Sequence, residues 1–362
     1  MAKTLAWGIL STGNIARTFA QGLTTSRTGR LVAVGSRTQE AADRFGAEFA
    51  VAPPHRHADY DALLADPAVE AVYIATPHPM HAAWAIKAAE QGKHILCEKP
   101  LTLNYAEAEA VVAAAHRHDV FLMEAFAYRC HPQTARLVEL IRAGAIGTVR
   151  ALQATYSFDG GDDPDSRLLR KDLGGGGILD VGCYPMSLVR LLAGAATGVP
   201  FAEPIDVMGA ASLGARSHVD EAAIAALRFP GDILAQIATG IRLQQENVVR
   251  VYGSEGSIVV PIPFAPSRDG GPSAIVVQTH GQPSATIVRE DSGPGPREIT
   301  IDSGIPAHTE AGLYGLEADI VAENLAARQA PAMTPDDSLG NMRALDRWRA
   351  AIGLVYNEEF AR

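Results

Sequence analysis

The residues that decide the fold are "TLAWGILSTGNIA", Thr4–Ala16, near the start of the chain. The apolar run that ends at Leu10 predicts a buried strand, and the residues behind the turn have a helical pattern. Between the two, Ser11, Gly13 and Ala16 occupy the three positions of the G-x-G-x-x-G/A turn of dinucleotide-binding folds. Gly13 would let the backbone approach a pyrophosphate, and the helix N-terminus behind it offers free N–H groups. Serine departs from the first glycine of the pattern, and an ordinary strand-to-helix turn is the alternative.

Strand and helix patterns alternate through the rest of the first third of the chain. Further strands are predicted at Leu31–Ser36, Ala71–Ala75, Ile95–Cys97 and Val120–Glu124, with helical patterns between them. Such alternation is typical of a parallel sheet with right-handed crossovers, in which ligands bind at the carboxyl ends of the strands. We therefore expect an N-terminal Rossmann domain over residues 1–125.

Residues 126–362 have a different pattern, in which strands follow one another with few helices between them. Strands are predicted at Thr148–Phe158, Ile205–Ala211, Glu221–Arg228, Ile233–Leu243, Val248–Tyr252 and Ser257–Val260. Residues 261–296 are rich in Gly, Pro and Ser and predict hairpins and loops. Two amphipathic helices, near Gly312–Arg328 and Pro335–Gly353, close the chain, and the last is a candidate for packing against the first domain. The expected class is α/β, a Rossmann domain followed by an α+β domain with a large, open, mostly antiparallel sheet.

The composition excludes several classes of partner. The 362 residues are 47% hydrophobic and 20% charged, which supports a substantial core, and the net charge is −10. An acidic chain is a poor candidate for a general nucleic-acid or anionic-membrane surface, so neither partner is expected. Three cysteines without a C-x-x-C pattern predict reduced thiols. The first residues have no apolar segment of the signal-peptide kind, and we expect a cytoplasmic protein.

The end of the second predicted strand indicates which dinucleotide is bound. An acidic residue there would bond the ribose 2′-hydroxyl of NAD. This chain has Ser36, Arg37 and Thr38 instead. Hydroxyl groups and a guanidinium suit a 2′-phosphate, because arginine binds phosphate through two parallel hydrogen bonds. The pattern favours NADP, with NAD as the other possibility. The alternative is that Arg37 is a solvated loop arginine without a role in binding.

A lysine stands at the end of the fourth predicted strand, in "KHILCEKPLTLN", Lys93–Asn104. Lys99 follows buried apolar residues, and Pro100 biases it toward an extended backbone. Glu98 is adjacent in sequence but points to the opposite face of a strand. Lys99 would thus lie where a parallel sheet binds its ligand, although a surface lysine at the start of a loop is equally compatible with this stretch.

A second stretch brings an acid and a phenol together, in "RLLRKDLGGGGILDVGCYP", Arg167–Pro185. The four glycines predict either a linker or a close approach of the backbone to another group. The residues that follow predict a helix over Ile178–Leu192, and Asp180 and Tyr184 are four apart, so they would share one face. Pro185 predicts a kink or a short first segment. The alternative is an ordinary helix start, with Asp180 answering the dipole and Tyr184 half-buried.

Taken in order, these motifs resemble the Gfo/Idh/MocA family of NAD(P)-dependent oxidoreductases. The resemblance rests on "GILSTGNIA", "SR" after the second strand, "ATPHPMH", "GKHILCEKPLTLN" and "GGGGILDVGCY". Many members of the family have histidine at the position of Tyr184. With tyrosine there, the chain resembles the branch that contains glucose–fructose oxidoreductase, dimeric dihydrodiol dehydrogenase and NADP-linked xylose dehydrogenase. The resemblance implies that the second domain serves substrate binding and oligomerisation, so a homodimer or homotetramer is expected.

The resemblance also implies roles for individual residues. Cofactor contacts are expected from Ser11, Thr12, Gly13, Asn14, Ile15, Ser36, Arg37, Thr38, Thr76, Pro77, His78, His81, Glu98 and Lys99. Tyr184 is also expected to contact the substrate. Aromatic and arginine side chains suit sugars, so Tyr128, Arg129, Tyr156 and Arg167 are candidate substrate contacts, with packing and surface charge as the alternative for each. Lys99 would be catalytic, together with Tyr184 and Asp180.

The chemistry of hydride transfer explains why this pair is needed. A proton must move to or from the oxygen of the reacting carbinol carbon, and a free tyrosine, with a pKa of about 10, is a poor base near neutrality. A lysine ammonium lowers that pKa. Tyr184 is thus expected as general acid/base, with Lys99 tuning it and Asp180 orienting substrate or lysine. The roles of Lys99 and Tyr184 are exchangeable at this stage.

The sequence therefore predicts an NADP-dependent oxidoreductase acting on a sugar, polyol or cyclic diol. A nucleotide-binding sensor or scaffold, and a sugar–sugar oxidoreductase with tightly held cofactor, are the competing hypotheses. His78 and His81 are three apart without a third ligand nearby, so no metal site is expected. His55 and His57 are expected to be solvated loop residues.

Overall fold

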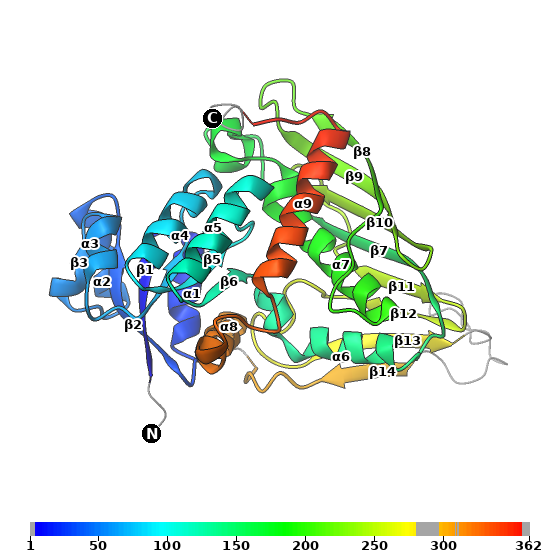
Figure 1. Ribbon diagram of the computed structural model, residues 1–362, viewed down its shortest axis with the longest axis horizontal. Coiled ribbons are helices and arrows are strands. Elements are labelled where there is room, and N and C mark those ends of the chain that lie inside the picture. The colour runs from blue at the N-terminus through cyan, green and yellow to red at the C-terminus, as the bar shows by residue number, and fades with distance from the viewer. Residues whose placement is uncertain (1–3, 280–296, 308, 310, 357–362) are drawn as a thin grey trace. The chain divides into compact units, whose positions relative to one another are not determined.

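The computed structural model describes residues 4–279, 297–307, 309 and 311–356, and it divides the chain into two compact units (Figure 1). The first unit contains Met1–His131, Ser267–Gly271 and Ile305–Met342. The second contains the remaining segments, of which Pro132–Pro266 is the longest. This division is less simple than one boundary at residue 125, because two later segments of the chain belong to the first unit.

The first unit is built on a six-stranded parallel sheet in the order β3-β2-β1-β4-β5-β6, so the predicted Rossmann fold is confirmed. Its strands are β1 (Leu5–Leu10), β2 (Gly29–Gly35), β3 (Arg56–His57), β4 (Ala71–Ile74), β5 (His94–Glu98) and β6 (Leu122–Ala125). Its helices are α1 (Asn14–Leu23), α2 (Gln39–Glu48), α3 (Tyr60–Ala65), α4 (His81–Glu90), α5 (Tyr105–Arg117) and α8 (Gly312–Asn324). The two-residue strand β3 was not predicted, because it is too short to have a period.

Aromatic packing joins the first strands and the first helix. The rings of Phe19 and Tyr73 stack at 3.9 Å between centroids, and Trp7 meets Phe19 edge-on at 5.2 Å. All six residues of β1 are buried, as expected for a central strand with both faces covered. Polar caps begin the helices: Asn104 accepts a 3.0 Å hydrogen bond from the N–H of Glu107 at the start of α5.

Helix α8, from the C-terminal part of the sequence, belongs to the first unit and packs on α1 (Figure 1). Asp319 of α8 accepts hydrogen bonds from the hydroxyl groups of Ser26 and Thr28, both at 2.6 Å, and from the N–H of Arg27 at 3.0 Å. These bonds hold the helix against the turn that leads into β2. Of the two predicted closing helices, this one belongs wholly to the Rossmann unit.

The second unit contains an eight-stranded sheet in the order β14-β13-β12-β11-β7-β10-β9-β8. Its strands are β7 (Val149–Ser157), β8 (Asp206–Leu213), β9 (Asp220–Phe229), β10 (Ile233–Gly240), β11 (Val249–Gly253), β12 (Gly256–Val260), β13 (Ser273–Thr279) and β14 (Arg297–Ile301). All neighbouring pairs are antiparallel except β7 with β10, which confirms the predicted mostly antiparallel sheet. Strand β13 falls within the region predicted as hairpins and loops, and residues 280–296 of that prediction lie outside the described residues.

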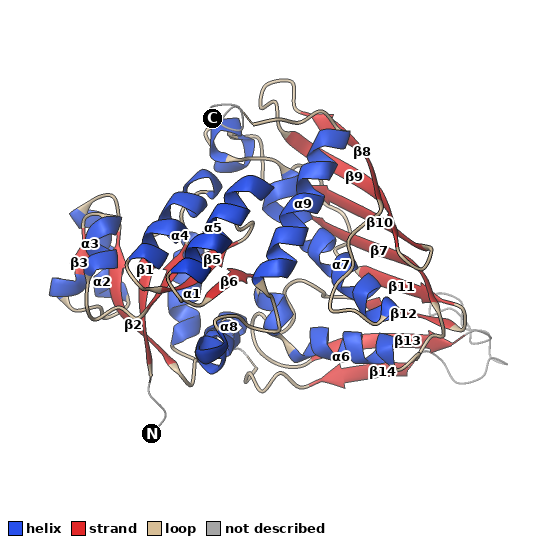
Figure 2. Cartoon of the chain, in the orientation of Figure 1, coloured by secondary structure: helices blue, strands red, loops and turns tan. Residues whose placement is uncertain are grey.

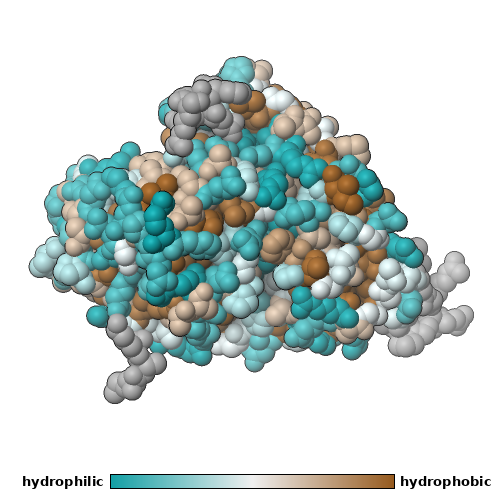
Figure 3. All heavy atoms as spheres, in the orientation of Figure 1, coloured by the Kyte–Doolittle hydropathy of each residue, from teal (hydrophilic) through white to brown (hydrophobic). Residues whose placement is uncertain are grey.

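Two helices of the second unit, α6 (Pro132–Arg142) and α7 (Cys183–Thr197), pack against this sheet (Figure 2). Helix α9 (Pro335–Ala351) is shared between the units, because the division falls after Met342. The other face of the sheet leaves Met208, Ile224 and Leu234 more than half exposed. In the face of the molecule seen in Figure 3, exposed apolar residues form small groups between polar ones.

The helical stretch Lys171–Thr197 is long and apolar enough to cross a membrane by length and composition. In its most apolar window, however, 89% of the residues are buried inside the protein, as in a core helix. It is the one such stretch among the described residues.

Candidate functional site

Six of the fourteen predicted cofactor contacts line one cavity of about 510 Å³ in the first unit. It is lined by Ser11, Thr12, Gly13, Ser36, Arg37, Thr38, Ala41 and Tyr60. The cavity lies where β1 and β2 end, which is the edge at which a doubly wound sheet binds ligands. Asn14 and Ile15, also predicted as cofactor contacts, are the first residues of α1 behind it.

Ser11 keeps the backbone conformation that the glycine of this turn would have. Its φ is +100°, a region that residues with a side chain rarely adopt. The Ser11 N–H donates to the carbonyl of Gly35 at 2.9 Å, and its hydroxyl accepts a 3.3 Å hydrogen bond from the N–H of Gly13. These contacts stabilise a turn that the sequence pattern identified as a departure from the glycine motif.

The end of β2 presents hydroxyl groups and a guanidinium to the cavity. The hydroxyl groups of Thr12 and Ser36 lie 3.2 Å apart, and Thr38 caps α2 by accepting from the N–H of Ala41. Arg37 is exposed, so its guanidinium is available to a ligand. Carboxylates do not line the cavity among the described residues. The site thus offers a full positive charge and no negative one.

Tyr60 is a lining residue that the sequence did not suggest. Burial raises the pKa of its phenol, and the Arg37 charge and a hydrogen bond with Ser11 act in the opposite direction. Its ring also meets Trp84 edge-on at 5.0 Å. Tyr60 opens α3 behind Asp59, and nothing in that local pattern distinguishes it from an ordinary core residue.

Lys99 follows β5 directly, at the same carboxyl edge of the sheet. Glu98 is buried beneath it and accepts a hydrogen bond from the phenol of Tyr73. The other carboxylate oxygen of Glu98 accepts a 3.2 Å hydrogen bond from the N–H of Lys99. Glu98 therefore fixes the main chain of Lys99 from inside the sheet, and the Lys99–Pro100 peptide bond is cis.

His81 joins the end of β4 to the loop that begins at Lys99. The ring is fully buried, with Nε2 2.8 Å from the carbonyl oxygen of Thr76 and Nδ1 2.9 Å from that of Pro100. Both ring nitrogens thus face backbone oxygens, so His81 braces two loops rather than offering a metal ligand. His78 lies edge-on to it, with ring centroids 5.7 Å apart.

The second unit holds Tyr184 in a group of three aromatic rings. Tyr156 meets Tyr184 edge-on at 5.1 Å and stacks on Phe264 at 5.0 Å. Phe264 was not among the predicted site residues, because it follows β12 in a stretch read as loop. The three rings come from β7, α7 and this loop. They form an aromatic surface that includes Tyr184, the predicted general acid/base.

Asp180 and Arg167, predicted separately, are paired with each other. Nη2 of Arg167 lies 2.8 Å from Oδ1 of Asp180, whose side chain is almost fully buried. Asp180 lies in a short π-helical turn, Ile178–Gly182, that directly precedes α7. The helix that was predicted as one α-helix therefore begins with π-helical backbone. Pro185 is the third residue of α7, where the π-helical turn passes into regular α-helix.

Two family models, one for each domain, match the chain and together cover most of it. The oxidoreductase family with an NAD-binding Rossmann fold matches residues 5–126, and the GFO/IDH/MocA C-terminal domain matches residues 134–259. The chain belongs to the GFO/IDH/MocA oxidoreductase family. It is an NAD(P)-dependent oxidoreductase, as predicted.

Individual relatives of this family member are named dehydrogenases and reductases. Trans-1,2-dihydrobenzene-1,2-diol dehydrogenase from Mus musculus is 34% identical over 268 residues, covering 73% of this chain and 76% of the relative. D-xylose 1-dehydrogenase (NADP(+)) 2 from Haloferax volcanii is 38% identical over 190 residues, covering 52% and 58%. The crystal structure of a 3-ketoreductase from Actinomadura kijaniata in complex with NADP and TDP-benzene has a TM-score of 0.78 at 25% identity, covering 97% and 98%.

Two further predicted substrate contacts of this GFO/IDH/MocA member have internal partners. Tyr128 is fully buried, and Arg129 is buried beside Asp337, with Nη2 2.6 Å from Oδ2 of that residue. The Nε of Arg129 also donates to the carbonyl of Ala332 at 3.0 Å. In the structure described, both side chains therefore stabilise the interior of the first unit.

The sequence suggested that His55 and His57 are solvated loop residues, but in the structure they share one partner. Both rings contact the same oxygen of Asp66, at 2.7 and 2.9 Å. Burial alone would raise the pKa of Asp66, but hydrogen bonds from His55, the N–H of Ala68 and His57 lower it overall. The group ties β3 to the end of α3.

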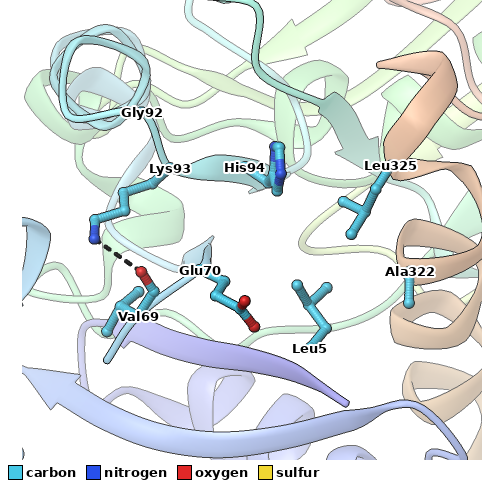
Figure 4. Close-up of a pocket in the computed structure, with 8 residues that line it drawn as sticks. All are labelled: Leu5, Val69, Glu70, Gly92, Lys93, His94, Ala322 and Leu325. Atoms are coloured by element: carbon cyan, nitrogen blue, oxygen red, sulfur yellow. Dashed lines mark hydrogen bonds between the residues drawn. The ribbon is translucent and has the colours of Figure 1, made fainter. Parts of the chain in front are cut away.

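A second cavity of this family member, of about 490 Å³, lies at the opposite edge of the Rossmann sheet (Figure 4). Its residues include Leu5 and His94, the first residues of β1 and β5. Figure 4 shows Lys93 directed toward the carbonyl of Val69, with Nζ 2.8 Å from that oxygen. Because parallel sheets bind ligands at their carboxyl ends, we do not assign the dinucleotide to this cavity.

Proposed function

We propose that this protein is an NADP-dependent oxidoreductase that interconverts a carbinol and a carbonyl group on a sugar, polyol or cyclic diol. The observation that carries the proposal is the cavity in which Arg37 and the hydroxyl groups of Ser36 and Thr38 follow β2, and which no carboxylate of the described residues lines. A nicotinamide cofactor bound along this edge supplies hydride transfer. The names of the relatives, a dihydrobenzenediol dehydrogenase, a D-xylose 1-dehydrogenase and a 3-ketoreductase, support the substrate class.

NADP is preferred over NAD because of the charge at the end of β2. A guanidinium binds the 2′-phosphate with two charge-assisted hydrogen bonds, and the hydroxyl groups of Ser36 and Thr38 add neutral donors. The NADP named in the solved 3-ketoreductase and in the xylose dehydrogenase is consistent with this preference.

The proton that accompanies hydride transfer is assigned to Tyr184 and Lys99. Tyr184 exchanges the proton with the substrate oxygen, and the ammonium of Lys99 favours the phenolate form. Glu98 supports this role by fixing the backbone of Lys99. Asp180, paired with Arg167, orients the polar groups of the substrate.

The substrate class is also supported by the aromatic surface of Tyr156, Tyr184 and Phe264. Aromatic faces pack against the C–H faces of a sugar or an alicyclic ring, while the phenols offer hydrogen bonds. For the assembled enzyme we propose a homodimer or homotetramer formed through the exposed sheet face, which contains Met208, Ile224 and Leu234. A cytoplasmic location stays a prediction from the sequence.

A panel of aldoses, ketosugars, polyols and cyclic diols, assayed with NADP(H) and with NAD(H), tests the proposed function. We expect turnover with NADP(H) on at least one member. Lys99→Ala and Tyr184→Phe should each lower kcat by about a hundredfold or more, the size of a general acid/base contribution. Tight NADP binding with no turnover across the panel would instead support a nucleotide-binding sensor. Unchanged kcat in both variants would contradict the assigned proton chemistry.

A further inference from the structure

Two of the four glycines before the Tyr184 helix, Gly176 and Gly177, lie against a buried carboxyl group. A Cβ atom on Gly176 would lie 2.2 Å from Oδ1 of Asp220, and the φ of Gly176 is +110°. A Cβ atom on Gly177 would lie 3.3 Å from Oδ2 of the same residue. Asp220 is the first residue of β9 and is fully buried. The glycine run therefore exists where backbone and carboxyl group meet without room for a side chain.

Asp220 bonds the first residue of the segment that carries the predicted catalytic groups. Its Oδ2 accepts a 2.6 Å hydrogen bond from the N–H of Ile178. Ile178 opens the π-turn that contains Asp180, and Tyr184 follows in the first turn of α7. The first N–H groups of a helix lack partners within the helix, and a negative charge there is favoured by the helix dipole. Asp220 thus fixes the point at which this segment begins.

Other contacts surround the same run. The Tyr356 phenol donates to the carbonyl of Gly175 at 2.5 Å, and the Thr239 hydroxyl donates to that of Gly177 at 3.2 Å. Oδ1 of Asp220 has no hydrogen-bond partner among the described residues. The carboxyl group is therefore bonded on one oxygen only, although it is fully buried.

The charge of Asp220 is set by opposing effects. Burial raises its pKa to about 7, against the hydrogen bonds from backbone N–H groups and the positive charge of Arg349. The guanidinium of Arg349 lies 5.1 Å from the centre of the Tyr356 ring. Among the described residues of the C-terminal segment, Arg349 and Tyr356 are the charged and titratable groups at the Asp220 locus, and β10 contributes the uncharged Thr239.

We propose that Asp220 is a positioning residue for Tyr184 and Asp180, and that its ionised form holds their segment in the reactive arrangement. The inference rests on the proposed function, in which Tyr184 exchanges the proton. A hydrogen bond to a carboxylate is roughly twice as strong as one to a neutral oxygen. Protonation of Asp220 therefore weakens the bond to Ile178 without breaking the fold.

The test compares kcat and KM as functions of pH in the wild type, Asp220→Asn, Asp220→Ala and two controls. The wild-type kcat should rise through a pH of about 7. Asp220→Asn keeps the shape and a neutral acceptor, so its kcat should stay about tenfold lower above pH 7 and be flat there. Asp220→Ala should lower kcat further, with NADP affinity unchanged. Thr239→Val, which removes the other bond to the run, and Asp232→Asn, at an exposed turn, should both keep the rise.

A second measurement separates this inference from the proposed function. The Cζ resonance of Tyr184 can be assigned in ¹³C-tyrosine-labelled protein by its loss in Tyr184→Phe. It should move in Asp220→Asn and not in Asp232→Asn, whether or not a substrate has been found. An unmoved resonance, or an Asp220→Asn variant that keeps the wild-type rise in kcat, would overturn the inference even if Asp220→Ala fails to fold.

Discussion

Arg37 is the single residue on which the cofactor preference depends. It is exposed at the cavity, and its charge lowers the pKa of Tyr60 against the effect of burial, so it acts on the cavity interior. Ser11 holds the opposite wall of this site in a conformation that glycine adopts more readily. The chemistry of the site thus depends on side chains that local periodicity does not require.

Arg37→Ala should weaken NADP binding and leave NAD binding nearly unchanged. Loss of a charge-assisted bond to a phosphate costs about 1.5–3 kcal/mol, or roughly ten- to a hundredfold in Kd. Calorimetric titration with both dinucleotides measures the difference. Arg30→Ala, an exposed arginine in the first part of β2, is the matched control and should change neither Kd. Equal losses for NADP and NAD would contradict the assignment of the 2′-phosphate to Arg37.

Two short elements decide where the larger ones lie. The glycine run places the π-turn and α7 against β9, and the Asp319 cluster places α8 against the start of β2. Each is a local contact between segments far apart in sequence. Changes at these points are therefore expected to affect stability more than their size suggests.

Gly176→Ala should destabilise the second unit strongly. The added Cβ would lie 2.2 Å from Oδ1 of Asp220, and φ is +110°, so we expect a loss of about 3 kcal/mol or more. Gly198→Ala is the control: its φ is +81° with no heavy atom near the new Cβ, and it should lose about 1 kcal/mol. Urea unfolding measures both. Equal losses would show that backbone strain alone, not the carboxyl contact, requires the glycine.

Asp319→Ala should release α8 from the first unit. The carboxylate accepts bonds from Ser26, Thr28 and Arg27, so its loss should cost about 3 kcal/mol in the free energy of unfolding. Burial would raise the pKa of Asp319, but these bonds lower it overall, so its stabilisation is present above pH 4 and lost as pH falls below that. Glu323→Ala removes an exposed partner of Arg27 and should cost no more than about 0.5 kcal/mol. A similar loss in both variants would contradict this account.

At the scale of the whole molecule, buried carboxyl groups set the pH dependence of stability. Burial raises the pKa of the Glu317 carboxyl group in the first unit, and repulsion from Glu98 raises it further. Burial also raises the pKa of the Asp220 carboxyl group in the second unit. Neither oxygen of Glu317 has a hydrogen-bond partner among the described residues. A group whose pKa is raised by folding stabilises the fold at pH values below its pKa in the unfolded chain. This contribution is lost as the pH rises through its pKa in the folded protein.

Glu317→Gln should therefore reduce the loss of stability between pH 5 and pH 8. Each pH unit over which only the folded state stays protonated is worth about 1.4 kcal/mol, so the wild type should lose more than the variant over this range. Unfolding followed at several pH values measures the difference, with Glu323→Gln as the exposed control. If the wild type and Glu317→Gln have parallel pH profiles, burial does not hold Glu317 in its protonated form.

The sequence by itself determined the fold class and most of the longer elements. The period of the apolar residues predicted β1 and the alternation of strands and helices in the first unit, because burial of one face acts on neighbouring residues. The glycine turn and the strand-end lysine predicted a site at one edge of the sheet, because parallel strands bring their carboxyl ends together there. These signals are local, or follow from a general property of the fold.

Only the tertiary structure decided which side chains meet. Tyr60, Phe264 and Asp220 are separated in sequence from the groups they contact, and no period marks them. Arg129 was predicted to face a substrate, but Asp337, more than two hundred residues later, is its partner. A buried charge requires a counter-charge, and the chain can supply it from any segment that the fold brings near. The pairing of such groups is therefore a property of the folded molecule.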